Sequence, residues 1–327
     1  MPERMRIVFC GTPSFAVPTL KHLLGQADFE IVGVITQPDR PRGRGQEVSF
    51  SAVKETALAA NLVVHQPEKI RAPETETLLR KLAPDCVIII AYGQIIPARL
   101  LSIPKLGWIN LHASLLPKYR GAAPINWAIV NGETRTGVTT MRIDAGMDTG
   151  EMLLRREIEI GAGETAPELA TRMSECGGAL MAQTLRGLRD GAISPKAQNH
   201  AEVSYAPMLK KADGRIDWKR PAVEIYNRMR GFAPWPGAYT TFRGKTCHVW
   251  GEPVSKEGGA GFRSGEGGAA PGTLFGEKNE LFAGCGDATV LRIQVVKLEG
   301  RKPVKATDFA NGARLKSGER FGDTWFA

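Results

Sequence analysis

Residues 107–121, Gly-Trp-Ile-Asn-Leu-His-Ala-Ser-Leu-Leu-Pro-Lys-Tyr-Arg-Gly, contain an apolar run that is interrupted by two polar side chains. Asn110 and His112 are two positions apart, so an extended strand directs both side chains to one face of a sheet. Ser114 and Pro117 end the strand, which places the pair at its carboxyl end, where open α/β sheets bind ligands. An amide donor beside an imidazole suits chemistry in which an oxyanion forms and a proton moves. The pair alone is equally compatible with a buried strand end whose polar groups are satisfied internally.

Apolar runs alternate with helical patterns on both sides of this stretch, which predicts a Rossmann-like α/β domain with a mostly parallel sheet over residues 1–190. Strands are expected at 6–10, 30–36, 62–65, 86–91, 108–111, 137–143 and 151–160, the last of them at an edge. Helices are expected at 16–24, 51–60, 74–82, 124–130 and 165–190.

The remaining sequence predicts a linker and a second, smaller domain. Residues 191–207 have a weak pattern typical of a linker, and 208–327 are expected to form an OB-like β-barrel. Its strands are expected at 238–243, 246–251, 272–275, 280–283 and 289–298, and its helices at 221–231 and 307–316. Gly, Ala and Ser dominate 258–272, which predicts a loop.

The composition is that of a globular protein, with 43% hydrophobic and 24% charged residues among 327. No apolar run approaches the ~20 residues of a membrane span, and the first residues lack the apolar region of a secretory signal. Five cysteines form no Cys-x-x-Cys pair, which argues against a disulfide framework and a zinc site. We therefore expect a cytoplasmic, monomeric protein without a metal and without a membrane partner.

Positive charge is concentrated in the second half of the chain. Residues 208–327 hold 20 Lys and Arg against 13 Asp and Glu, a net charge of +7, whereas residues 1–207 contribute +2 of the total of +9. This asymmetry favours a polyanionic partner, although a solubilising surface has the same composition. Arg40, Arg42 and Arg44 alternate within 37–46, whose prolines and glycines predict a loop. These arginines suit phosphate contacts, and an exposed solubilising loop is the alternative.

Two familiar kinds of active site are excluded by spacing. Gly11 is followed by Pro13 and Phe15, so the glycine fingerprint of dinucleotide binding is missing. No Gly-x-Ser-x-Gly segment occurs, and nothing marks Ser114 as an activated nucleophile. Asp148 lies in a glycine-flanked turn after the strand at 137–143 and is expected to face His112 and orient its imidazole. The attacking group is therefore expected to belong to a substrate, in a direct acyl transfer between two substrates.

The chain resembles the folate-dependent formyltransferases in segments that span nearly its whole length. The resemblance is carried by Asn110-Leu-His-Ala-Ser-Leu-Leu-Pro117, Arg120-Gly-Ala-Ala-Pro124, Gly137-Val-Thr and Asp144-Ala-Gly-Met-Asp-Thr-Gly150. Further matches, to the members that act on methionyl-tRNA, are Gly11-Thr-Pro13, Gln37-Pro-Asp-Arg40 with Gly43-Arg-Gly45, Ala91-Tyr-Gly-Gln94, Arg215-Ile-Asp-Trp218 and Pro234-Trp-Pro236. The resemblance is weakest in 251–271, where this chain carries extra glycine-rich sequence.

This resemblance implies a reaction and a set of roles. The α-amine of methionine on initiator methionyl-tRNA would attack the formyl carbon of 10-formyltetrahydrofolate, for translation initiation. Asn110 and His112 would hold the oxyanion, and Asp148 would position His112 and help to move the proton. Implied folate contacts are Tyr92, Gln94, Ile95, Ile96, Pro97, Ser114, Leu115, Leu116, Pro117 and Asp144. Arg40, Arg42 and Arg44 would enter the acceptor-stem groove, and the basic C-terminal domain would lie along the stem.

Each rival interpretation leaves some of these sequence features without a function. A formyltransferase acting on a purine-precursor ribonucleotide or a nucleotide-linked amino sugar shares the trio and the folate, but needs neither the arginine loop nor a basic second domain. A non-catalytic RNA-binding protein does not need the intact trio. Base stacking by Trp218, Trp235 and Trp250 is the alternative to the core role that we expect for them. The other histidines, His22, His65, His200 and His248, are interpreted as structural or exposed.

Overall fold

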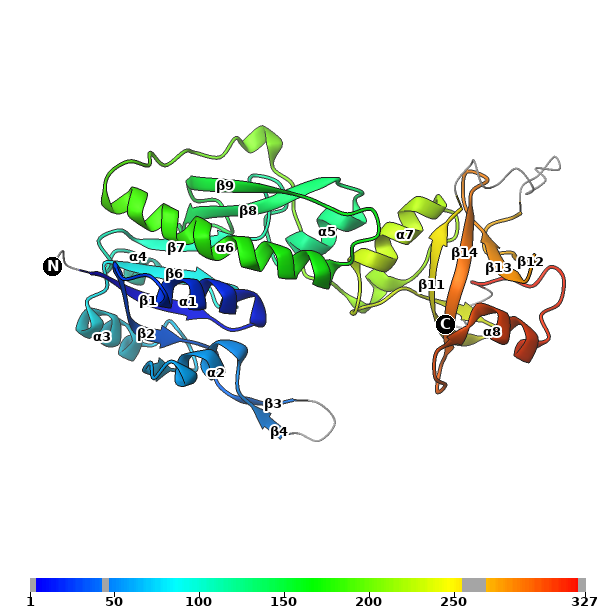
Figure 1. Cartoon of the computed structure of the whole chain (residues 1–327), viewed down its shortest axis with the longest axis horizontal. Coiled ribbons are helices and arrows are strands. Elements are labelled where there is room, and N and C mark those ends of the chain that lie inside the picture. The colour runs from blue at the N-terminus through cyan, green and yellow to red at the C-terminus, as the bar shows by residue number, and fades with distance from the viewer. Residues whose placement is uncertain (1–3, 43–46, 255–268, 323–327) are drawn as a thin grey trace. The chain divides into compact units, whose positions relative to one another are not determined.

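The computed structural model describes residues 4–42, 47–254 and 269–322 of the chain (Figure 1). Two compact units make up the chain, and each is described by itself. The N-terminal unit comprises Met1–Ile125, Arg135–Ile160 and Glu168–Pro207. The C-terminal unit comprises Asn126–Thr134, Gly161–Pro167 and Met208–Ala327.

The N-terminal unit is built on a seven-stranded sheet in the order β5-β2-β1-β6-β7-β8-β9 (Figure 1). The strands are β1 (Met5–Gly11), β2 (Phe29–Ile35), β5 (Val64–His65), β6 (Cys86–Ile90), β7 (Trp108–His112), β8 (Arg135–Arg142) and β9 (Met152–Glu159). The ladders from β5 to β7 are parallel, whereas β8 runs antiparallel to both β7 and β9. The prediction of a Rossmann-like, mostly parallel sheet is therefore confirmed, with β9 at the edge.

Helices connect the parallel strands, as β-α-β crossovers require. They are the 3-10 turn η1 (Ser14–Ala16), α1 (Val17–Leu24), α2 (Ala52–Ala59), α3 (Pro73–Leu82) and the short α4 (Ala98–Leu101). Helix α5 (Pro124–Val130) instead lies between the antiparallel strands β7 and β8, and α6 (Ala166–Arg189) follows β9. Helix α3 shows why these segments are helical: proline occupies its first turn, Glu74 and Glu76 follow, and Arg80 and Lys81 lie in its last turn. This charge order complements the helix dipole.

Helix α6 covers one face of β7 and thereby decides which way the polar pair of that strand points (Figure 1). A Cβ atom on Gly177 of α6 would lie 2.4 Å from Cδ2 of Leu111, so only glycine lets the helix approach the strand this closely. Side chains alternate along a strand, so Asn110 and His112 project from the face opposite to α6. The pair therefore shares the face that α6 leaves uncovered.

The segment predicted as an arginine loop contains regular structure, and that part of the prediction is wrong. Strands β3 (Arg40–Arg42) and β4 (Glu47–Ser49) form a two-stranded antiparallel ribbon, with Pro41 opposite Val48. Proline is excluded from a central strand because it lacks an N–H donor, but both strands of a ribbon have a free edge. The prolines therefore exclude a central strand here without excluding a short ribbon.

The C-terminal unit is an antiparallel sheet in the order β10-β11-β14-β13-β12, with β15 paired to β14. Its strands are β10 (Tyr239–Phe242), β11 (Lys245–Pro253), β12 (Leu274–Glu277), β13 (Glu280–Gly284), β14 (Val290–Leu298) and β15 (Val304–Lys305). Helices α7 (Ala222–Gly231) and α8 (Ala306–Ala313) pack against it, and two 3-10 turns, η2 (His200–Glu202) and η3 (Lys211–Gly214), precede it. This arrangement is consistent with the predicted OB-like domain. Part of the predicted glycine-rich loop, residues 258–268, lies outside the described residues.

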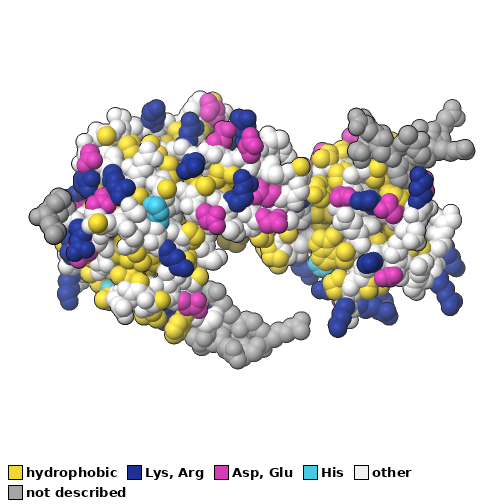
Figure 2. All heavy atoms as spheres, in the orientation of Figure 1, with side chains coloured by type: hydrophobic (Ala, Val, Ile, Leu, Met, Phe, Trp, Pro, Cys, Tyr) yellow, Lys and Arg dark blue, Asp and Glu magenta, His cyan; other side chains and the backbone are white. Residues whose placement is uncertain are grey.

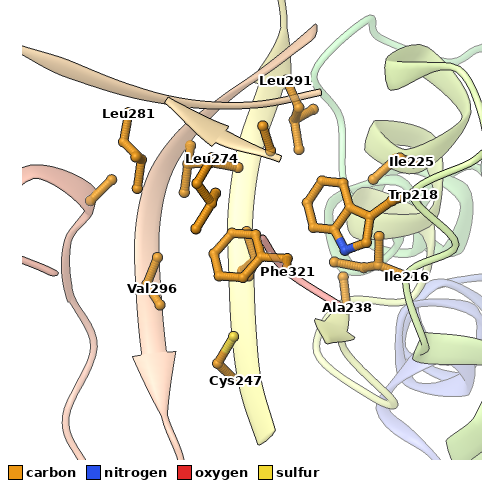
Figure 3. Close-up of a cluster of buried hydrophobic side chains, with 14 of the residues drawn as sticks. Ile216, Trp218, Ile225, Ala238, Cys247, Leu274, Leu281, Leu291, Val296 and Phe321 are labelled. Atoms are coloured by element: carbon orange, nitrogen blue, oxygen red, sulfur yellow. The ribbon is translucent and has the colours of Figure 1, made fainter. Parts of the chain in front are cut away.

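Of the three tryptophans that were considered for base stacking, Trp218 lies in the core of the C-terminal unit. Figure 3 shows Trp218 and Phe321 among buried apolar side chains, and their rings stack with centroids 5.4 Å apart. The indole N–H of Trp218 donates to Oγ1 of Thr240 at 3.0 Å. Trp235 and Trp250 are instead 54% and 39% exposed, so the expected core role is wrong for these two. Trp235 lies between α7 and β10, and Trp250 lies in β11, where its ring stacks on that of His248.

Residues 191–207 run back over the N-terminal unit and make specific contacts with it. Lys196 exchanges two backbone hydrogen bonds with Met152 of β9, each 2.8 Å long. Further along, the N–H of Arg120 donates to the carbonyl of Ser204, and the N–H of Ala206 donates to the carbonyl of Arg120. The segment therefore has defined partners despite its weak sequence pattern. Among the described residues, no helix is long and apolar enough to cross a membrane.

Candidate active site

Asn110 and His112 lie on the last residues of β7, where the parallel part of the sheet meets its antiparallel part. Asn110 pairs with Ile89 of β6 on one side and Met141 of β8 on the other, and His112 pairs with Thr139. The sheet thus fixes the backbone of Asn110 from two sides and that of His112 from the side of β8. A site on such elements is more rigid than one built on loops alone.

His112 is 6% exposed and both of its ring nitrogens face oxygen atoms. Nε2 lies 2.9 Å from the carbonyl oxygen of Tyr119. A carbonyl only accepts hydrogen bonds, so this contact assigns a proton to Nε2. Nδ1 lies 3.6 Å from Oδ2 of Asp148, which is ion-pairing distance but too long for a strong hydrogen bond. The imidazole can therefore take up a proton on the side that faces the carboxylate.

Asp148 is held in place by its own backbone geometry and by a neighbouring amide. Its φ angle is +53°, in the left-handed region that non-glycine residues rarely adopt. The backbone N–H of Gly121 donates to Oδ2 of Asp148 at 2.8 Å. The same oxygen faces Nδ1 of His112, so one carboxylate oxygen joins the turn at Gly121 to the imidazole.

Asn110 differs from His112 in being partly exposed and in having no side-chain hydrogen bond to any of the residues that the structure describes. Its amide is therefore available as a donor to a bound group. The structure brings all three members of the sequence-predicted trio to the carboxyl end of β7: two by strand register and Asp148 by the turn that follows β8.

The turn after β6 presents backbone groups rather than the Tyr92 side chain. Tyr92 is 2% exposed, its hydroxyl has no partner among the described residues, and burial raises its pKa above the ordinary value. Its carbonyl oxygen accepts from Nε2 of Gln37 at 3.0 Å and from Oγ1 of Thr12 at 3.3 Å. Any contribution of Tyr92 to a ligand site is therefore made through the turn that it anchors.

Gln94 uses its amide to hold that turn. Oε1 accepts from the N–H of Ile70 at 2.8 Å, and Nε2 donates to Oε1 of Gln37 at 3.2 Å and to the carbonyl of Glu68 at 3.3 Å. Ile95, the next residue, is 90% exposed, an unusual state for an apolar side chain. Ile96 is buried and Pro97 is half-buried, so Ile95 is the apolar side chain that the turn offers to a ligand.

The segment after β7 is locked internally. Oγ of Ser114 donates to the carbonyl of Lys118 at 2.6 Å, and Oγ1 of Thr139 donates to the carbonyl of Ser114 at 2.6 Å. The N–H of Leu116 donates to Oγ1 of Thr139 at 3.2 Å. Leu115 is half-buried, whereas Leu116 and Pro117 are buried. The hydroxyl of Ser114 thus donates its proton to a backbone carbonyl, which is not a base.

Asp144 shapes the turn that leads to Asp148. Its Oδ1 accepts from the N–H of Gly146 at 3.0 Å and from Oγ1 of Thr149 at 2.6 Å. This is an Asx-type turn, in which the side chain replaces a backbone acceptor. Asp144 itself is exposed, so its second oxygen faces solvent.

The structure describes the three arginines of residues 37–46 to different extents. Arg40 is exposed and lies 4.0 Å from Glu68, a loose surface ion pair. Arg42 ends β3, and Arg44 lies outside the described residues.

A basic hairpin is found in the C-terminal unit, at the turn between β14 and β15. It consists of Lys297, Arg301, Lys302 and Lys305, all exposed and without an ion pair to any described residue. Figure 2 shows Lys and Arg side chains projecting from the surface of this unit. Part of the positive charge of residues 208–327 is therefore located in this hairpin. Among the described residues, no cluster of three or more His, Cys, Asp or Glu side chains could hold a metal ion.

Sequence reasoning missed Gln198, which is 6% exposed and bonded to the Asp148 turn. Nothing in the local pattern marks it, because a glutamine in a polar segment resembles any exposed linker residue. Only the folded contacts reveal it.

Comparison with known proteins assigns the chain to one enzyme class. Residues 5–185 match the family described as "Formyl transferase", and residues 208–314 match "Formyl transferase, C-terminal domain". The chain is 52% identical over 320 residues to the methionyl-tRNA formyltransferase of Solibacter usitatus, covering 98% of this chain and 99% of that protein. It is 50% identical over 319 residues to the methionyl-tRNA formyltransferase of Koribacter versatilis, covering 97% of this chain and 99% of that protein. The chain therefore belongs to the formyltransferase family, in the branch of the methionyl-tRNA formyltransferases.

Solved structures share the fold at much lower identity. An N-formyltransferase from Helicobacter canadensis, in complex with folinic acid and dTDP-3-aminofucose, matches with a TM-score of 0.64 and 20% identity, over 89% of this chain and 99% of that one. The sugar 3N-formyl transferase WlaRD, in the presence of dTDP and 5-N-formyl-THF, matches with a TM-score of 0.62 and 19% identity, over 92% and 100%. At this identity the likeness extends to the fold alone.

Proposed function

We propose that this chain transfers the formyl group of 10-formyltetrahydrofolate to the α-amine of methionine on initiator methionyl-tRNA, for translation initiation. The observation that carries the proposal is the arrangement of Asn110, His112 and Asp148 at the carboxyl end of β7, with His112 3.6 Å from Asp148. Full-length relatives named methionyl-tRNA formyltransferase support the choice of acceptor.

The trio supports direct transfer without a covalent enzyme intermediate. The amine nitrogen of methionine forms a bond to the formyl carbon, and the formyl oxygen becomes an oxyanion. Asn110 donates to this oxyanion through its unpartnered amide, and protonated His112 stabilises it. The carbon–nitrogen bond to the folate then breaks as protonated His112 gives a proton to the departing folate nitrogen. The proton lost by the amine passes by way of Asp148 to His112 and restores its protonated form. One oxyanion donor of this kind accounts for roughly 10²–10³ in rate.

The donor site that we propose is framed by the turns at Tyr92–Pro97 and Asp144–Asp148 and by Ser114–Pro117. These turns offer backbone polar groups and the exposed Ile95 side chain. Such a mixture suits a flat heterocycle with hydrogen-bonding edges, since most ligand pockets combine apolar walls with a few fixed polar groups. Folinic acid and 5-N-formyl-THF in the two solved relatives support a folate as the ligand class.

The tRNA is proposed to contact Arg40, Arg42 and Arg44 through its acceptor stem and the basic hairpin through its phosphates. The exposed cations of the basic hairpin, which have no ion pair to any described residue, can neutralise phosphates and release condensed counterions, which makes binding strongly salt-dependent. We also propose a monomer that works in the cytoplasm. All five cysteines are free thiols, which suits a reducing compartment.

The test offers purified protein 10-formyltetrahydrofolate and three amine acceptors in parallel. These are initiator methionyl-tRNA, a nucleotide-linked amino sugar and an amino ribonucleotide. We expect formyl transfer to the methionyl-tRNA alone. Transfer to either small amine with none to methionyl-tRNA overturns the proposal and favours the rival substrate class. Light scattering of the eluted protein checks the monomer, and a mass of twice 35.5 kDa contradicts it.

A further inference from the structure

A buried hydrogen-bonded pair, Arg120 and Gln198, lies directly behind the turn that carries Asp148. Arg120 is 3% exposed and Gln198 is 6% exposed. Nε and Nη2 of Arg120 donate to Oε1 of Gln198 at 3.0 and 2.7 Å. Among the described residues, no carboxylate lies within ion-pairing distance of this guanidinium. A buried charge that is held by a neutral amide is uncommon, because burial of a charge normally requires a charged partner.

The other end of the Gln198 amide holds the Asp148 turn. Nε2 donates to the carbonyl of Asp148 and to the carbonyl of Gly150, each at 2.8 Å. Gln198 therefore makes four hydrogen bonds, which is the full capacity of two N–H donors and a carbonyl oxygen with two lone pairs. The two donors clamp the backbone on both sides of Thr149.

Only an amide can fill this place. A carboxylate accepts but does not donate, so it would satisfy Arg120 and face the two carbonyls with negative charge. An ammonium or guanidinium donates but does not accept, so it would satisfy the carbonyls and repel Arg120. The environment thus requires one side chain that is an acceptor on one side and a double donor on the other.

The clamp opposes a backbone strain at Asp148. A non-glycine residue at φ +53° persists only where its surroundings over-determine it. Three contacts do so: the two Gln198 bonds to the turn and the Gly121 N–H on the carboxylate. Arg120 is adjacent to Gly121 in the chain, so the same unit controls both the backbone and the carboxylate of Asp148.

We infer that Gln198, held by Arg120, is a positioning residue for the reaction: it sets the distance between Asp148 and His112 without touching the substrates. The inference rests on the proposed function, because it assigns a purpose to the geometry of the trio. Gln198 lies in the segment that follows α6, so part of the active site depends on residues outside the strands that carry it.

The test replaces Gln198 by glutamate, which keeps the acceptor for Arg120 and removes both donors to the turn. We expect kcat to fall about 10- to 100-fold, since misplacing a catalytic group by about 1 Å has effects of this size. KM for the folate and for the tRNA should stay within about twofold. The melting temperature should fall only slightly, because the new ion pair between Arg120 and the carboxylate offsets part of the cost of the two carbonyls that lose their donors. In proton NMR the ring N–H signals of His112 should shift, because Asp148 has moved.

Gln26→Glu is the matched control. The Gln26 amide also accepts from an arginine, Nη2 of Arg186 at 2.8 Å, and also donates to a backbone carbonyl, that of His22 at 3.3 Å. This control should retain wild-type kcat. An unchanged kcat for Gln198→Glu, or a loss shared equally by kcat, both KM values and the melting temperature, overturns the positioning role.

The two proposals fail in different ways. If the wild-type protein does not formylate methionyl-tRNA, the proposed substrate is wrong, and the ratio of variant to wild type is then measured with whichever amine is formylated. If the wild type formylates methionyl-tRNA and Gln198→Glu does so equally fast, only the positioning role is wrong.

Discussion

Gly121 and Asp148 are joined by a hydrogen bond of 2.8 Å from the backbone N–H to Oδ2, the oxygen that faces the imidazole of His112. Gly121 has a φ of +120°, and a Cβ atom there would lie 2.7 Å from the carbonyl oxygen of Ala206. The close packing of the 120–121 turn against the segment at 206 thus depends on the absence of a side chain.

Gly121→Ala should therefore lower both stability and activity. The left-handed backbone costs roughly 1–2 kcal/mol and the clash with a backbone atom about 1–3 kcal/mol, so we expect about 3 kcal/mol of lost unfolding free energy in urea titrations. Gly191→Ala is the control, because its φ is +66° and its Cβ would meet nothing within 4 Å. Equal losses in the two variants would show that the contact with Ala206 has no energetic weight.

Asn110→Asp tests the proposed oxyanion donor. The substitution keeps the size of the side chain, removes the N–H donor and adds a negative charge next to the developing oxyanion. We expect kcat to fall at least 10²–10³-fold, while the dissociation constant for methionyl-tRNA, measured by filter binding, stays within about twofold. A variant that turns over normally but binds tRNA poorly would place Asn110 in RNA recognition instead.

The basic hairpin should determine part of the salt dependence of tRNA binding. Each phosphate contact contributes about 0.9 to the slope of log affinity against log salt. Lys302→Ala and Lys305→Ala should therefore each reduce that slope by about 1 without changing kcat. Arg80→Ala is the control: Arg80 is already paired with Glu76 at 2.8 Å in α3, and its loss should leave the slope unchanged. A slope that stays constant in both hairpin variants contradicts the proposed phosphate contacts.

An ion pair joins helix α6 to the residue that precedes β2. Nη2 of Arg186 in α6 lies 2.7 Å from Oδ1 of Asp28, the residue before β2, and this hydrogen bond holds the pKa of the Asp28 carboxyl below its ordinary value of 3.8. A carboxyl whose pKa is lowered in the folded state stabilises the fold above pH 3.8, and this stabilisation is lost as the pH falls through the lower folded pKa.

Asp28→Asn should accordingly destabilise the protein at pH 7 and not at low pH. The side chains of Asp28 and Arg186 are 31% and 39% exposed, so solvent screening limits the effect at pH 7 to about 0.5–1 kcal/mol. Urea unfolding at pH 7 and at pH 3 measures the difference between variant and wild type, which should shrink toward the acid side. A difference that is the same at both pH values would assign it to packing.

A site residue could be predicted from sequence where its position depends on neighbouring residues in the chain. The alternation of β7 fixes the shared face of Asn110 and His112, and the position of Pro117 fixes where the strand ends, so both were accessible to pattern reasoning. Asp148 required only the assumption that neighbouring strands bring their ends together. Gln198 lies 50 residues from Asp148 in the chain, in a segment without periodicity, and its role exists only in the folded contacts.

Gln94 shows the converse case, in which a motif residue that is expected to contact a ligand has its side-chain amide bonded to partners within the protein. The resemblance implies a folate contact, but both ends of the amide are occupied by Ile70, Gln37 and Glu68. Sequence identifies the turn correctly, whereas the direction of a side chain depends on partners 24 to 57 residues away. We therefore expect Gln94 to act on folate binding through the shape of the turn.

Gln94→Glu separates these two roles. The substitution keeps the acceptor for the N–H of Ile70 and removes the donors to Gln37 and Glu68, so the turn loosens and Ile95 loses its fixed position. We expect the dissociation constant for 5-formyltetrahydrofolate, measured by calorimetry, to rise about 10-fold, a loss of about 1.4 kcal/mol. At saturating donor, kcat should change less than twofold, because Asn110, His112 and Asp148 are untouched. A fall in kcat with unchanged folate affinity would instead bring the Gln94 side chain into the chemical step.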